Sequence, residues 1–184
     1  INKVIDILKN LQIGYHNVQH TLEVTFATAQ AMLKHFENTG QSDPVSFFQA
    51  TIAALFHDIG YSNHREILAY VKSVKKEEYE DLMKKAKGPD FVRAFEAFQT
   101  KLVEQGEAIS LTGAELHQYH VLLSQLLLPC VVNLALPLPF SGDVLFSEES
   151  IETMKCIIAQ TDIKKDAEPF KRLCMERLGA ENKG

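Results

Sequence analysis

The chain has 184 residues, of which 46 % are hydrophobic and 23 % are charged, a balance typical of a globular protein with one sizeable core. We therefore expect a single domain over residues 1–184. The formal net charge of −5 argues against a general binder of nucleic-acid duplexes or of anionic membranes.

The cysteines and the apolar runs indicate in which cellular compartment the protein is expected. Cys130, Cys156 and Cys174 are an odd number with no Cys-x-x-Cys pair, which fits a reducing compartment such as the cytoplasm. The longest apolar run, residues 121–140, is interrupted by two amides and three prolines, too often for a membrane span. The first residues show no basic start followed by an apolar core, so no signal peptide is expected.

Hydrophobic residues recur at helical spacing at the start of the chain. We expect a short helix over residues 1–11, a break at Gly14, and a longer helix over residues 15–36. The longer helix is expected to bury one apolar stripe, formed by Leu22, Phe26, Ala29, Leu33 and Phe36.

The next predicted helix is apolar on nearly every face. Asp43 and Pro44 form a strong start, an N-cap followed by proline at the first helical position. The apolar residues of 45–58 predict a helix in the centre of a bundle rather than on its surface. Gly60 is expected to end this helix.

Residues 64–87 indicate one or two further helices, and the alternating charges of residues 72–87 indicate a solvated face. The next helix is expected to pack a regular stripe into the core, formed by Phe91, Phe95, Phe98 and Leu102.

The C-terminal third again shows helical periodicity and no alternating strand pattern. We expect a helix from about residues 112–113 to just before Pro129, then a proline-rich loop over 137–143. Ser147 is expected to cap a helix over 148–162 with a buried stripe of Ile151, Met154 and Ile158, and a short helix over 166–178 follows. The predicted fold is an all-α helical bundle.

The chemistry of the chain centres on His57 and Asp58, which end the apolar run. Burying an imidazole beside a carboxylate costs several kcal/mol unless both groups find partners, and a divalent cation satisfies both. His16 and His20 stand four residues apart, on one face of the predicted second helix. Asp162 follows Ile158 by four residues and should point inward.

Two imidazoles and two carboxylates, from His20, His57, Asp58 and Asp162, would complete a site for a divalent cation with positions left for water. This mixed nitrogen and oxygen set accepts manganese, iron, nickel, zinc or magnesium.

These motifs resemble those of the HD-domain metal-dependent phosphohydrolases. The segment Tyr15-His16-Asn17-Val18-Gln19-His20-Thr21-Leu22-Glu23-Val24 is particularly similar to the first signature of class I cyclic-nucleotide phosphodiesterases. The resemblance extends from this segment through most of the chain, and it implies a helical bundle of the HD type.

The resemblance also implies roles for individual residues. His20, His57, Asp58 and Asp162 match the metal ligands, with Asp58 as the bridge where a second metal is bound. The family uses its metal to activate water for attack on phosphorus. His16 matches the histidine that protonates the leaving oxygen in the phosphodiesterase branch, a task suited to histidine, which titrates near neutral pH.

Two departures narrow the expected substrates. The purine-clamping glutamine of phosphodiesterases lies well downstream of the last metal aspartate, and few residues follow Asp162 here, so cyclic-nucleotide specificity is not expected. The Gly-Tyr-Pro element of the cyclic-dinucleotide branch is also absent, because Ser62 follows Gly60 and Tyr61.

Each assignment has a structural alternative. His57 and Asp58 could be a buried hydrogen-bonded pair, His20 a core histidine, and His16 a residue that merely orients the helix start. Asp166 competes with Asp162 as the last ligand. Three further histidines could either approach the site or lie on the surface, namely His64, His117 and His120. The phosphate contacts could come from Arg65, Arg93 or Lys101, among which the sequence does not choose.

The predicted function is metal-dependent hydrolysis of a phosphate ester in a nucleotide or a small phosphorylated metabolite, with His16 and Asp58 as catalytic residues. One alternative is a catalytically silent HD domain that binds metal or ligand and regulates a partner. The other is a structural helical bundle without a metal.

Overall fold

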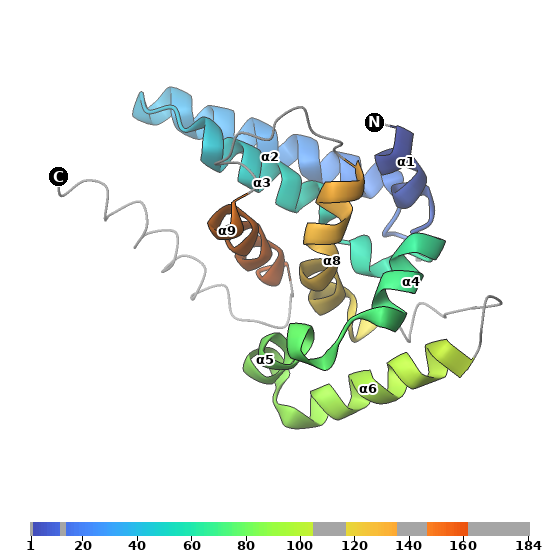
Figure 1. Ribbon diagram of the computed structural model, residues 1–184. Coiled ribbons are helices and arrows are strands. Elements are labelled where there is room, and N and C mark those ends of the chain that lie inside the picture. The colour runs from blue at the N-terminus through green and yellow to red at the C-terminus, as the bar shows by residue number, and fades with distance from the viewer. Residues whose placement is uncertain (1, 12–13, 105–116, 136–146, 162–184) are drawn as a thin grey trace.

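The computed structural model describes residues 2–11, 14–104, 117–135 and 147–161, and these residues form an all-α fold (Figure 1). The elements are α1 (Asn2–Lys9), α2 (Val18–Thr39), α3 (Pro44–Phe56), the 3-10 turn η1 (Ile59–Tyr61), α4 (Arg65–Ser73), α5 (Lys76–Lys87), α6 (Pro89–Glu104), α8 (His120–Ala135) and α9 (Glu148–Ala159). Within the described residues no β-strand forms, and an isolated bridge joins Leu11 to Ser62. The predicted all-α class is confirmed.

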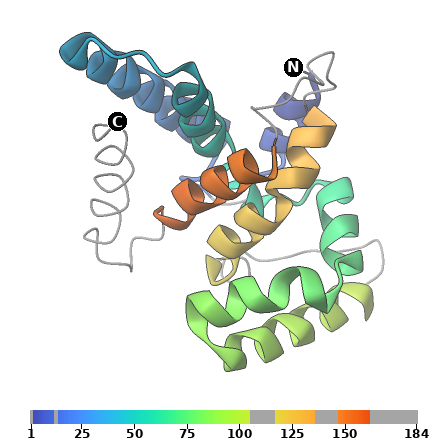
Figure 2. The ribbon, with the colours of Figure 1, turned by 60° about the vertical axis from the view of Figure 1, so that its left-hand side comes forward.

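Helix α8 lies at the centre of the fold, where it packs against α9, η1, α4, α5 and α1 (Figures 1 and 2). Its side chains at Leu127, Leu128 and Val131 are fully buried. Pro129 was expected to end this helix, but it lies inside α8, so that prediction is wrong. A proline inside a helix costs about 3 kcal/mol, which the burial of apolar side chains on both sides of Pro129 offsets.

Helix α3 is central only in its second half. Its start is as predicted, because the Asp43 side chain accepts hydrogen bonds from the backbone N–H groups of Val45 and Ser46. Residues 45–51 are half-buried, whereas Ile52 to Ala54 and Phe56 are buried. The expectation of a helix buried along its whole length is therefore wrong for its first half.

The α3 helix ends at Phe56, two residues before the predicted end, and Gly60 is not its cap. Gly60 lies inside η1, where its N–H donates to the Ser124 hydroxyl at 2.9 Å. A Cβ added to Gly60 would lie 2.1 Å from the backbone oxygen of His120. Glycine is needed here for the close approach of η1 to the start of α8, not to stop a helix.

Helix α2 departs most from expectation. The stripe that was predicted to be buried is largely exposed, with Leu22 at 52 %, Phe26 at 66 % and Leu33 at 52 % exposure. Among the residues of α2 only Thr21 is buried. The helix packs on α3, and the two form a hairpin that projects from the rest of the protein (Figures 1 and 2). The projection leaves the outer face of α2 without any described neighbour to cover it.

The remaining described helices follow the sequence patterns. Residues 64–87 form two helices, α4 and α5, and the α6 stripe is buried at Phe95, Phe98 and Leu102. The Ser147 side chain accepts a hydrogen bond from the Ser150 N–H and caps α9, as predicted. Met154 and Ile158 of α9 are fully buried, although the helix ends at Ala159 rather than at 162.

Some predictions fall outside the described residues, namely the helix start at 112–113, the loop over 137–143 and the helix over 166–178. In the part of the chain that the structure describes, no helix has both the length and the apolar character needed to cross a membrane.

Candidate metal centre

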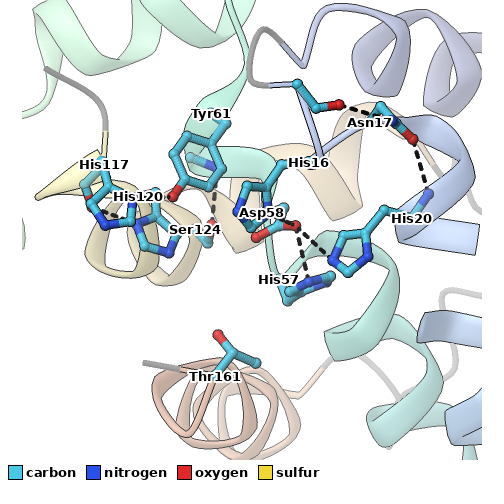
Figure 3. A network of polar contacts seen from close by, with 12 residues as sticks. His16, Asn17, His20, His57, Asp58, Tyr61, His117, His120, Ser124 and Thr161 are labelled. Atoms are coloured by element: carbon cyan, nitrogen blue, oxygen red, sulfur yellow. Dashed lines mark hydrogen bonds and ion pairs between the residues drawn. The ribbon is translucent and has the colours of Figure 1, made fainter. Parts of the chain in front are cut away.

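Three histidines and an aspartate from separate segments meet beside the end of α3 (Figure 3). His16 precedes α2, His20 lies in its first turn, and His57 and Asp58 follow α3 directly. The sequence therefore predicted correctly that these four residues would gather.

The start of α2 positions the first two histidines. Asn17 is the N-cap, and its side chain accepts a hydrogen bond from the His20 N–H while donating to the Gly14 carbonyl. His16 was expected on the helix beside His20, but the helix begins only at Val18. His16 approaches the site from the preceding loop, because the Asn17 cap stops the helix from extending backward.

The backbone of Asp58 forms the start of η1, while its carboxylate takes no part in capping η1 and contributes to the site. Its φ of −104° and ψ of 8° lie in the bridge region, where many active-site residues are found. It begins η1 through a backbone bond from the Tyr61 N–H to its carbonyl, and its side chain makes no capping bond to η1. The Asp58 side chain is only 3 % exposed.

The three imidazoles surround one oxygen of this buried carboxylate. Asp58 Oδ2 lies 2.7 Å from His16 Nδ1, 3.0 Å from His57 Nε2 and 3.5 Å from His20 Nε2. A buried carboxylate needs positive charge or hydrogen-bond donors around it, and in the described structure the ring nitrogens of these three histidines surround it.

A backbone contact fixes the tautomer of His57. Its Nδ1 lies 2.7 Å from the Ala54 carbonyl oxygen, which can only accept, so Nδ1 carries a hydrogen. In the neutral ring, Nε2 then presents a lone pair toward Asp58. Such a lone pair facing a carboxylate oxygen at 3.0 Å is repulsive unless a proton or a cation lies between the two atoms.

The electrostatics of the pair agree with this geometry. Burial lowers the pKa of His57, but the hydrogen bond and charge of Asp58 and the Ala54 carbonyl outweigh it, so the pKa is raised. Burial would raise the pKa of Asp58, but His57 and His16 outweigh it and the pKa is lowered. For His20, burial is the largest cause and the pKa is lowered. The protein thus keeps Asp58 ionised and His20 neutral, the forms in which both bind metal.

The described donors fit a metal ion. His16, His20 and Asp58 each offer one ligand atom, and these atoms lie within 4.8 Å of one another, so this group could hold an ion. Imidazole nitrogen and carboxylate oxygen together suit zinc, manganese, iron or nickel. Of the predicted ligands this group contains His20 and Asp58 but not His57, and it adds His16, which was predicted to act as the acid.

Asp162, the predicted fourth ligand, lies outside the described residues. The structure follows α9 to Thr161, which Figure 3 draws on the same side of the cluster as His57. The Thr161 hydroxyl donates to the Ile158 carbonyl at 2.7 Å.

A row of stacked rings lies next to His16 and was not predicted as part of the site. The Tyr61 ring lies 4.6 Å from that of His16 and stacks on that of His120 at 4.3 Å between centroids. The fully buried Tyr61 has its pKa raised to about 12 by burial and by the Asp58 charge, so its hydroxyl stays protonated, and this hydroxyl is hydrogen-bonded with His117 Nδ1 at 2.8 Å. His120 Nδ1 donates to the His117 carbonyl.

The sequence offered only a weak signal for this row. Tyr61 and His117 are 56 residues apart, and the sequence left open whether His117 and His120 approach the site or lie on the surface. The close approach of Gly60 to His120 is what brings them beside the site.

Other candidates have ordinary structural roles. His64 is the N-cap of α4, with its Nδ1 accepting a hydrogen bond from the Glu66 N–H. Arg93 pairs with Asp90 on the exposed surface of α6.

Comparison with protein-family models gives no match for this sequence, and neither a curated protein nor a solved structure matches it. The geometry of the site and the chemistry of its residues therefore carry the functional argument.

Proposed function

We propose that this chain is a metal-dependent phosphohydrolase of the HD type, acting on a phosphate ester of a nucleotide or small phosphorylated metabolite. One observation carries the proposal: three imidazoles from two segments meet at one buried Asp58 oxygen. Such a cluster is costly to bury without a function. Its residues match the HD-domain motif residues, which supports this function over other metal-dependent reactions.

The residues divide into holding and reacting groups. His20, His57 and Asp58, with Asp162 as the fourth group, would hold the cation. A divalent cation bound there would activate water and offset negative charge on the phosphoryl group. The Ala54 carbonyl orients the His57 ring so that its Nε2 faces Asp58 Oδ2.

His16 is assigned to the leaving group. In its protonated form it carries a hydrogen on each nitrogen, and Asp58 accepts the one on Nδ1. The hydrogen on Nε2 is then available to the ester oxygen as the phosphorus–oxygen bond breaks. Water contributes the oxygen that ends on phosphorus, and its released proton restores the His16 imidazolium. The products are an alcohol and a phosphate carrying one fewer ester link.

The test combines metal content with turnover. Protein loaded with manganese, nickel or magnesium should hydrolyse members of a panel of nucleotides and p-nitrophenyl phosphates. Asp58→Asn should lose both bound metal and turnover, whereas Asp90→Asn, an exposed aspartate on α6, should retain both. Metal binding without turnover on any panel member would favour the regulatory alternative, and protein that binds no metal would contradict both.

A further inference from the structure

The ring of His16 is held by one hydrogen bond and by the rings around it. Its Nδ1 lies 2.7 Å from Asp58 Oδ2, and its Nε2 makes no hydrogen bond within the part of the chain that the structure describes. A single hydrogen bond fixes one edge of a ring but not its plane, so the direction of Nε2 depends on the neighbouring rings. The nearest are Tyr15, His20 and Tyr61, with centroids 5.6, 5.5 and 4.6 Å from that of His16.

Of these neighbours, Tyr61 has the most firmly fixed position. Tyr15 is 71 % exposed and has room to move, and His20 belongs to the group that could hold the metal. Tyr61 is fully buried, and the planes of its ring and that of His16 make an angle of 31°. Because a close-packed interior leaves a buried ring little freedom, the plane of Tyr61 limits the plane of His16.

Two histidines at the start of α8 hold Tyr61 in turn (Figure 3). The Tyr61 ring stacks on that of His120, with centroids 4.3 Å apart and an angle of 14° between the planes. The Tyr61 hydroxyl is hydrogen-bonded with His117 Nδ1 at 2.8 Å, and His120 Nδ1 donates to the His117 carbonyl at 2.6 Å. The packing of η1 on α8 therefore fixes the ring that lies against His16.

We propose that Tyr61 is a positioning residue, whose ring holds the His16 ring in the plane in which Nε2 points to the leaving oxygen. This inference rests on the proposed function, because it takes His16 as the acid. A proton donor contributes fully only when it is aligned with the oxygen that it serves, and a misplacement of about 1 Å can cost about 10²-fold in rate. Tyr61 itself transfers no proton in this account, because its hydroxyl is paired with His117.

Two esters that differ in their need for an acid test this role. p-Nitrophenolate leaves readily as an anion, whereas phenolate, whose conjugate acid has a pKa of about 10, leaves faster when its oxygen is protonated. In Tyr61→Leu, which removes the flat ring, the turnover number of the manganese-loaded protein on phenyl phosphate should fall by about 10²-fold. The turnover number on p-nitrophenyl phosphate and the manganese affinity should change little. A purely structural role would lower both turnover numbers by the same factor.

Conservative variants separate the ring from its hydroxyl. Tyr61→Phe keeps the ring and should recover most of the turnover number on phenyl phosphate. His117→Ala removes the same hydrogen bond, so both variants should show the same small loss, and their combination no more than either alone. Tyr79→Leu is the matched control, because Tyr79 of α5 is also buried but packs against Phe95 of α6. This control should leave the ratio of the two turnover numbers unchanged, and circular dichroism checks the helix content of each variant.

The His16 ring can also be observed without turnover. In the metal-free protein its nitrogen NMR signals, identified by their absence in His16→Asn, should be sharp in the wild type and in Tyr61→Phe. In Tyr61→Leu they should be broadened by exchange between ring orientations. Sharp signals in Tyr61→Leu overturn the proposal, as does an equal loss of turnover on both esters.

Two further outcomes have separate meanings. A wild type that hydrolyses no ester or nucleotide overturns the proposed function and the acid role of His16 with it, and the NMR signals then decide by themselves whether Tyr61 positions the His16 ring. If Tyr61→Leu does not fold, His117→Ala decides, because His117 is exposed and its loss should leave the fold intact. Turnover and His16 signals equal to those of the wild type in His117→Ala would then overturn the proposal.

Discussion

At the scale of single residues, the site is organised around the Asp58 Oδ2 atom. His57 can approach it at 3.0 Å only with a proton or cation between them, since its other nitrogen is committed to the Ala54 carbonyl. His16 contacts the same oxygen through Nδ1 at 2.7 Å. Under the proposed function this geometry is compatible with two roles for His16, as a metal ligand or as the acid that serves the leaving group.

A substitution at His16 separates these roles. In His16→Asn, the amide N–H₂ lies near the former Nδ1 and can still donate to Asp58, but no proton is available for the leaving oxygen. We expect the turnover number to fall by about 10²–10⁴-fold, the usual contribution of a general acid, with metal affinity nearly unchanged. Steady-state kinetics and calorimetric titration with manganese measure the two effects.

The matched control is His35→Gln, an exposed histidine of α2, the helix that follows His16, and roughly 22 Å from His20 along the helix axis. This variant should change neither the turnover number nor the metal affinity. Loss of metal affinity in His16→Asn in step with turnover would make His16 a ligand instead.

At the scale of elements, the sequence predicted where helices form better than which face each one buries. Periodicity and the caps at Asp43 and Ser147 located α3 and α9 well, because these signals are local. The α2 stripe was assigned to the core because an apolar stripe usually faces the largest available core. Whether such a core lies on that side of α2 depends on distant parts of the chain, which local spacing does not encode.

The same contrast holds within the site. His16, His20, His57 and Asp58 were found because they belong to short motifs with characteristic spacing. The ring stack beyond them was not predicted, and the place of His117 and His120 was left open, because both reach Tyr61 only through the packing of α8 on η1.

The start of α3 offers a test of local stability. Asp43→Ala removes the bonds to two backbone N–H groups and should lower the free energy of unfolding by about 1 kcal/mol. Asp43→Asn keeps a side-chain oxygen that can accept these bonds, so it should retain most of this stabilisation. The Ser46 hydroxyl, followed by the backbone N–H bonds, holds the pKa of Asp43 below its usual value despite the opposing effect of burial.

The sign of the pH dependence follows from that shift. A carboxyl with a depressed folded pKa contributes stability that is fully present above its unfolded pKa, about 3.9, and that is lost as pH falls through the folded value. Urea unfolding between pH 7 and pH 3 should therefore show the wild type losing its advantage over Asp43→Asn below about pH 4. An advantage that stayed constant down to pH 3 would show that the carboxylate charge adds nothing to the cap.

The contact between η1 and α8 can be tested at Gly60. In Gly60→Ala the new methyl group would meet the His120 carbonyl, so the start of α8 must shift, at a cost of about 1–3 kcal/mol of stability. Because η1 directly follows Asp58, metal affinity should fall as well. Gly14→Ala has nothing within 4 Å of its new methyl group and should leave both the stability and the metal affinity unchanged. Chemical denaturation and metal titration of the two variants give the comparison. If Gly60→Ala were as stable as Gly14→Ala, the start of α8 would be able to shift away from the new methyl group without loss of stability.

At the scale of the whole molecule, the site lies where the α2–α3 hairpin meets the rest of the fold, to which α3 is also joined by its packing on α9. The projecting hairpin meets the body of the fold at its base, where His20 of α2 and His57 after α3 approach Asp58. On the other side of Asp58, η1 packs against α8. A cation at this point would join the start of α2 to the segment that leads from α3 into η1, and η1 packs on the central helix α8, so its binding should stabilise the whole fold.

Metal binding should therefore raise the thermal stability of the entire chain in one transition. A ligand that binds only the folded state at 100 times its Kd adds about 2.7 kcal/mol, which for a chain of 184 residues corresponds to a rise in Tm of roughly 5–10 °C. Scanning calorimetry with and without manganese should show this rise, a chelator should reverse it, and Asp58→Asn should lack it while Asp90→Asn keeps it. A rise of equal size in Asp58→Asn would mean that the metal binds elsewhere. Two separate transitions would show that the hairpin and the body unfold independently, and that the site does not join them.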